Sequence, residues 1–128
     1  MPPPEGRRRK ILLVDDDPTV LVTYSRMLGL HDFDVHTAMD AERGLLKAFS
    51  YRPDAILLDL RMPLADGLAF LRRLREREKP ARTPVAIVTG DYLIDEAVTK
   101  ELNELGAIVH FKPLWLEDLV DVVQRLIP

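Results

Sequence analysis

Four short apolar runs in the chain each lead into a charged or hydroxyl-bearing residue. The runs cover residues 11–14, 55–58, 85–88 and 107–111, and they lead into Asp15, Asp59, Thr89 and Lys112. Short apolar runs with such boundaries indicate strands that are buried on both faces of a parallel sheet. A fifth strand is predicted over residues 33–38, where apolar and polar residues alternate.

Segments with apolar residues at helical spacing separate these strands. Helices are predicted from Pro18, after Asp40, from Asp66, over the weaker segment 93–105, and over residues 116–126. Asp17 and Asp40 suit N-cap positions, and Gly106 suits the end of the fourth helix. The charged outer face of the third helix, which includes Arg75 and Glu78, is predicted to be solvated surface. Strand and helix alternate five times, which predicts an open α/β sheet with right-handed crossovers.

Polar side chains gather at one edge of this predicted sheet. In open α/β sheets, ligands bind beyond the carboxyl ends of the strands, where Asp15, Asp16, Asp59, Thr89 and Lys112 would meet. A cluster of carboxylates is costly unless a cation shares it, which points to a divalent metal beside a reactive aspartate. An aspartate is ionised at neutral pH and can attack phosphorus without a general base.

Composition and charge narrow the class of protein. The chain has 128 residues, enough for one domain with a hydrophobic core, and it contains no cysteine, which excludes disulfides and thiolate metal sites. It has no apolar stretch of bilayer-spanning length and its start does not resemble a signal peptide, so we expect a cytoplasmic protein that does not bind membranes.

Residues 1–9 are expected to form a flexible basic lead-in to a domain that covers residues 10–128. The lead-in contains Arg7, Arg8 and Arg9, whereas the net charge of the whole chain is −3, so the domain itself is acidic. An acidic domain argues against direct nucleic-acid binding.

The pattern closely resembles the receiver domain of bacterial two-component response regulators. The matching segments are ILLVDDDP at 11–18, ILLDLRMP at 56–63, DG at 66–67, VAIVTG at 85–90 and FKP at 111–113. The resemblance implies a flavodoxin-like (βα)5 fold, with a five-stranded parallel sheet in the order 2-1-3-4-5 and helices on both faces. It also implies a phosphorylated switch that takes its phosphoryl group from the phosphohistidine of a sensor histidine kinase or phosphotransfer protein. Such a switch controls a partner or output domain and turns over no external substrate.

The resemblance assigns roles to individual residues of this chain. Asp59 becomes the phosphoacceptor, and Asp15, Asp16, Asp59 and the backbone carbonyl of Arg61 become ligands of Mg²⁺, which Mn²⁺ could replace. Thr89 and Lys112 become the groups that bind the phosphoryl oxygens, and the peptide bond before Pro113 is expected to be cis. Asp17 is expected to cap a helix and not to bind the metal.

The chain departs from the family pattern at one switch position. Receivers commonly carry an aromatic residue three positions before the lysine, and that position here is Val109. Arg61 and Asp91 occupy rim positions that modulate the lifetime of the aspartyl phosphate in the family. The face formed by the fourth helix, last strand and last helix is the family's exchange face and a candidate homodimer surface.

Other functions compete with the receiver interpretation. A receiver-like module could bind proteins without phosphorylation, although the complete set of site residues argues against it. A hydrolase of the haloacid-dehalogenase class would carry an acid two residues after the nucleophile, where this chain has Arg61. A flavin carrier would need a phosphate-binding loop rich in Ser, Thr and Gly after the first strand, and none is present.

Overall fold

The computed structural model describes residues 8–60, 64–78, 82–90 and 95–127 of the chain. Its elements alternate along the sequence as β1 (Lys10–Val14), α1 (Pro18–Leu30), β2 (Asp34–Ala38), α2 (Ala41–Tyr51), β3 (Ala55–Leu60), α3 (Leu64–Arg77), β4 (Val85–Thr89), α4 (Glu96–Glu104), β5 (Ala107–Phe111) and α5 (Leu116–Leu126). The five strands form one parallel sheet in the order β2-β1-β3-β4-β5, so the predicted fold class is confirmed.

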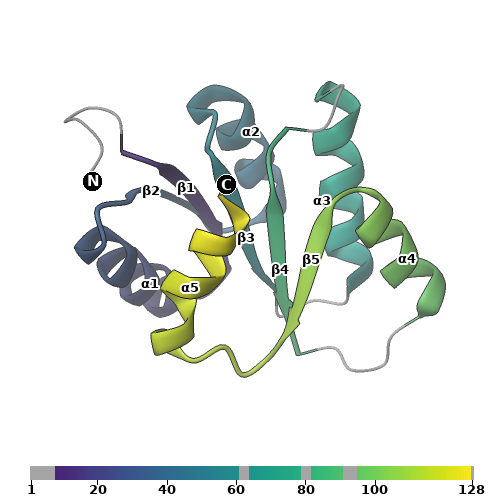
Figure 1. Ribbon diagram of the computed structural model, residues 1–128. Coiled ribbons are helices and arrows are strands. Elements are labelled where there is room, and N and C mark those ends of the chain that lie inside the picture. Colours follow the sequence, from purple (N-terminus) through teal and green to yellow (C-terminus); the bar gives the residue numbers. More distant parts are fainter. Residues whose placement is uncertain (1–7, 61–63, 79–81, 91–94, 128) are drawn as a thin grey trace.

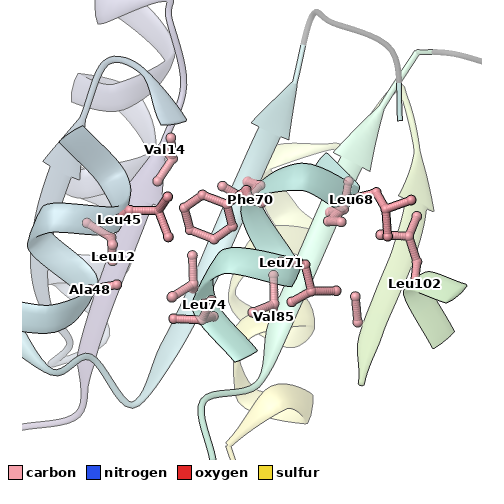
Figure 2. Close-up of a cluster of buried hydrophobic side chains, with 14 of the residues drawn as sticks. Leu12, Val14, Leu45, Ala48, Leu68, Phe70, Leu71, Leu74, Val85 and Leu102 are labelled. Carbon is pink, nitrogen blue, oxygen red and sulfur yellow. The ribbon is translucent and has the colours of Figure 1, made fainter. Parts of the chain in front are cut away.

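Helices cover both faces of the sheet (Figure 1). On one face, α2, α3 and α4 bury a core that includes Leu12, Phe70 and Leu102, shown in Figure 2. On the other face, α1 and α5 bury a second core that includes Leu28 and Leu119. The central strands β1, β3 and β4 are therefore buried on both sides, as their continuous apolar runs predict.

Aspartate side chains cap the N-termini of several helices, as the sequence predicts for the first two. Oδ1 of Asp17 accepts a hydrogen bond of 2.9 Å from the backbone N–H of Thr19 at the start of α1. Oδ1 of Asp40 accepts one of 2.8 Å from Arg43 at the start of α2. Each carboxylate satisfies a donor that the first turn of a helix leaves unpaired, and it places negative charge at the positive end of the helix dipole.

Two glycines allow close or unusual backbone arrangements. A Cβ atom on Gly44 of α2 would lie 2.9 Å from Cγ2 of Val14, so the missing side chain lets α2 approach β1. Gly106 has a φ of +83° in the tight connection between α4 and β5, a conformation that glycine adopts without strain.

The third helix differs from its prediction in two ways. It begins at Leu64 and not at Asp66, and its outer face is not all solvated, because Arg75 and Glu78 are buried. Nε of Arg75 donates a hydrogen bond of 2.8 Å to the carbonyl of Leu105, and Nη1 lies 2.7 Å from Oε1 of Glu78. The chain between α4 and β5 thus covers the end of α3. The buried guanidinium of Arg75 and the buried carboxylate of Glu78 satisfy each other's charge, and Arg75 also satisfies the Leu105 carbonyl.

Residues 1–7 and the predicted helix start at residues 93–94 lie outside the described residues, and α4 is described from Glu96 with Asp95 as its N-cap. None of the helices in the described ranges has both the length and the apolar character to cross a membrane.

Candidate phosphoacceptor site

The carboxyl ends of β1 and β3 bring two aspartates together. Val14 and Leu58 are partners in the register of these neighbouring strands, so Asp15 and Asp59 each follow at the next position. The strand β3 continues to Leu60, beyond the predicted run 55–58, so Asp59 lies within the strand and not after it. Both carboxylates are buried, with 4% and 6% of the residue exposed.

Lys112 brings a positive charge to the same edge of the sheet. Its backbone N–H donates a hydrogen bond of 2.8 Å to the carbonyl of Thr89, which holds the end of β5 against the end of β4. Its Nζ lies 2.8 Å from Oδ1 of Asp59. The Lys112–Pro113 peptide bond is cis, the isomer that the family resemblance implies. Thr89 is fully buried as the last residue of β4.

The surroundings of Asp15 disfavour its negative charge. Burial raises its pKa most strongly, and the charges of Asp59 and Asp16 raise it further, while a 2.8 Å hydrogen bond from the backbone N–H of Asp17 opposes these effects. The balance raises the pKa of Asp15 to about 7. Two neighbouring buried carboxylates repel each other when both are ionised, so the pair is suited to share a cation.

Tyr24 is a site residue that the sequence interpretation missed. Its hydroxyl lies near Asp59, and the pKa of Tyr24 lies well above its ordinary value because of burial and because of the negative charges of Asp59 and Asp15. Tyr24 also lines a hollow of about 470 Å³ beside Asp59, together with Lys112 and Leu114. The helical spacing of apolar residues predicts Tyr24 only as a core position of α1. The length and the polar hydroxyl of a tyrosine are the features that could have indicated a role in the site.

The oxygen atoms present fit a hard divalent cation such as Mg²⁺. Among the described residues, none donates a hydrogen bond of normal geometry to the buried Oδ1 of Asp59, which lies beside the ammonium of Lys112 and could also contact a bound ion. No three Asp, Glu or His side chains within the described ranges are grouped as metal ligands. Mg²⁺ does not require such a group, because it keeps several waters and is held by one or two carboxylates.

The other predicted site residues fall into three groups. Asp16 is exposed, and its carboxylate lies close enough to Asp15 to raise the pKa of Asp15. Arg61, predicted as a carbonyl ligand and rim residue, and Asp91, its predicted rim partner, lie outside the described residues. Val109 is half-buried in β5, opposite Ile87 of β4.

Comparison with known proteins decides the family. The response regulator receiver domain matches residues 11–124, which is most of the chain and includes the site from Asp15 to Lys112. The chain belongs to this family. Its members are signalling domains, in contrast to enzymes that turn over a substrate, and they bind Mg²⁺ at an acidic pocket.

Relatives of this receiver include a transcriptional regulatory protein and a sporulation initiation phosphotransferase. The transcriptional regulatory protein PrrA of Mycobacterium tuberculosis is 37% identical over 119 residues, which cover 92% of this chain and 49% of PrrA. The sporulation initiation phosphotransferase F of Bacillus subtilis is 28% identical, with 93% of this chain and 94% of that protein covered. The receiver thus spans about half the length of PrrA and nearly all of the phosphotransferase.

Solved structures agree with the fold. The chemotaxis response regulator CheY4 of Vibrio cholerae superimposes with a TM-score of 0.79 at 29% identity, and the match covers 94% of this chain and 99% of CheY4. The likeness therefore extends over nearly the whole length of both chains.

Proposed function

We propose that this receiver is a phosphorylation-dependent switch in which Asp59 accepts a phosphoryl group from the phosphohistidine of a sensor histidine kinase or phosphotransfer protein. The observation that carries the proposal is the contact between Asp59 and Lys112, with 2.8 Å between Oδ1 and Nζ, in a buried acidic pocket. A buried nucleophilic carboxylate beside a cation is what phosphoryl transfer to an aspartate requires.

The chemical step needs little beyond position and charge. An Asp59 oxygen attacks phosphorus in line with the departing histidine nitrogen; the O–P bond forms while the N–P bond breaks and its electron pair returns to the imidazole. Negative charge spreads over the phosphoryl oxygens in the transition state. Lys112 then serves as a point charge toward these oxygens, and the Thr89 hydroxyl donates a hydrogen bond to one of them.

Asp15, Asp16, Asp59 and the carbonyl of Arg61 would hold the Mg²⁺ ion, and Mn²⁺ could replace it. The ion supplies positive charge that screens the carboxylates from the incoming phosphoryl group. Burial is the main cause of the raised pKa of Asp15, and the charge of Asp59 adds to it; a bound cation would favour the ionised form of both carboxylates.

Phosphorylation would shift an equilibrium between two conformations that already exist and so change the contacts of a partner or output domain. The exposed apolar side chains Ile108, Phe111 and Trp115 support an output or homodimer surface formed by α4, β5 and α5. Val109 cannot make the large rotation of an aromatic switch residue, so the signal would travel through Thr89 and the segment after it. We further propose that residues 1–9 are a lead-in, that the domain covers 10–128, and that it acts in the cytoplasm without contacting nucleic acid.

Phosphoramidate provides the first test because its P–N bond resembles that of phosphohistidine. With Mg²⁺, the intact mass of the protein should increase by one phosphoryl group, and with EDTA it should not. Asp59→Asn should abolish the increase, whereas Asp54→Asn, which changes an aspartate just before β3 at the opposite end of that strand, should retain it. Equal labelling of the wild type and Asp59→Asn would contradict the proposal.

A further inference from the structure

A second pocket lies at the end of the sheet opposite Asp59. It has a volume of about 410 Å³ and is lined by the end of α2, the connection into β3, the end of α3 and the residues just before β4. Asp54 precedes β3 and Thr83 precedes β4, so the pocket adjoins the amino ends of strands whose carboxyl ends carry the phosphoacceptor site. The two sites can therefore be occupied independently.

Three arginines line this pocket: Arg52, Arg77 and Arg82. Within the described part of the chain, none of the three forms an ion pair with a carboxylate. The guanidinium of Arg77 lies 4.5 Å from the centre of the Phe49 ring, a cation–π contact that orients it at the pocket. The pocket thus concentrates positive charge that nearby acids leave unpaired.

The two acids in the lining are already bound to other groups. Oδ2 of Asp54 accepts a hydrogen bond of 2.7 Å from the backbone N–H of Lys10. Glu78 is held by Arg75 at 2.7 Å and also accepts a hydrogen bond from the Thr83 hydroxyl. Arg75 balances the charge of Glu78, whereas Asp54 keeps its negative charge and offsets one of the three arginines, so the lining remains net positive.

We propose that this pocket binds a small molecule that carries a phosphate or diphosphate group. Guanidinium groups match phosphate oxygens in shape and charge and can donate two parallel hydrogen bonds. A volume of about 410 Å³ lies within the range of small-molecule sites, roughly 300–1,000 Å³. The pocket is concave, which suits a compact anion. The two acids in its lining and the acidic domain around it would repel the long phosphate backbone of a nucleic acid.

NMR titration of the full chain, with inorganic pyrophosphate and ADP as probes and without Mg²⁺, tests the proposal. Both probes should give saturable shifts of the backbone amides of residues 48–52 and of Asp54, and adenosine, which lacks phosphate, should not. Arg52→Ala combined with Arg82→Ala should weaken binding about tenfold or more, since two charged donors are lost. Both side chains are exposed, so the fold should be retained, which the same spectra verify.

Arg73→Ala is the matched control, because Arg73 is an exposed arginine one turn before Arg77 on α3 and does not line the pocket. It should bind both probes as the wild type does. The proposal is overturned if neither probe saturates, if adenosine binds equally well, if the double variant keeps wild-type affinity, or if the shifts occur only around Lys112. None of these results bears on phosphorylation of Asp59, so the two proposals succeed or fail separately.

Discussion

The ammonium of Lys112, just beyond β5, lies 2.8 Å from the carboxylate of Asp59 in β3, although β4 separates these two strands in the sheet. Asp59 is buried, while the Lys112 side chain is one-third exposed at 33%. The ammonium of the lysine thus contacts the nucleophile, while part of the lysine side chain remains exposed to solvent. It can follow the negative charge from the carboxylate to an incoming phosphoryl group without leaving the pocket.

Lys112→Met keeps much of the length of the side chain and removes its charge. We expect phosphorylation by phosphoramidate to slow about tenfold or more, because the cation that faces the developing charge is lost. The rate of increase in intact mass measures this. Lys100→Met, which removes an exposed charge on α4, should react at the wild-type rate; an unchanged rate in Lys112→Met would remove the lysine from the mechanism.

Tyr24→Phe removes a hydroxyl that lies beside Asp59 in the same hollow and could donate a hydrogen bond to it. A hydrogen bond to a charged carboxylate stabilises it in the ground state, so its loss should make Asp59 more nucleophilic and speed phosphorylation by about two- to threefold. Tyr51→Phe is a suitable control, because the Tyr51 hydroxyl instead donates to Asp34. A rate that is unchanged or slower in Tyr24→Phe would show that its hydroxyl does not restrain the nucleophile.

Gly44→Ala should destabilise the protein by about 1–3 kcal/mol, because the new methyl group overpacks the core. Its Cβ would lie 2.9 Å from Cγ2 of Val14 and 3.4 Å from Cε2 of Phe70. Gly29→Ala in α1 should instead stabilise it by about 0.5–1 kcal/mol, since nothing lies within 4 Å and alanine favours helix. Urea denaturation of both variants measures these differences; equal effects would mean that α2 does not need its close approach to β1.

The Arg75–Glu78 pair should make stability depend on pH in the acid range. Burial acts to raise the pKa of Glu78, but the hydrogen bonds from Thr83 and Arg75 outweigh it and hold the pKa below its ordinary value. The ionised form is therefore favoured by folding: its contribution is complete above the pKa of the unfolded chain, about 4.5, and is lost as pH falls through the lower folded value.

Glu78→Gln should remove that acid dependence and lower the free energy of unfolding at pH 7 by about 1–3 kcal/mol, because Arg75 is left buried without its partner. Glu101→Gln is the matched control. Glu101 pairs with Arg72 at 2.5 Å on the surface, where solvent screens the charges, so a much smaller effect is expected. Urea denaturation measures the free energy of unfolding of both variants. Comparable decreases in the two would contradict a structural role for the buried pair.

Much of the site could be predicted because it depends on the ends of strands. Continuous apolar runs identify the buried strands, and parallel pairing then places Asp15 and Asp59 at one edge of the sheet. The cap role of Asp17 follows from its position directly before Pro18, which suits the first turn of a helix.

Other features depend on how elements pack, and helical periodicity does not contain that information. Tyr24 reaches Asp59 only because α1 packs close to the end of β3. Arg75 lies on a face of α3 that looks solvated in sequence, and its burial requires the carbonyl of Leu105, which is 30 positions away in the chain. The arginine-lined pocket likewise combines ends of α2 and α3 that only the folded sheet brings together.

The most direct measurement is tandem mass spectrometry of protein that has been treated with phosphoramidate and Mg²⁺ and then trapped with borohydride, which reduces an acyl phosphate and leaves a stable mark. We expect the mark on the peptide with residues 55–60, at Asp59, and nowhere else in the chain. A mark on Asp15, Asp16 or another carboxylate, with Asp59 unmodified, would contradict the assignment of Asp59 as the phosphoacceptor.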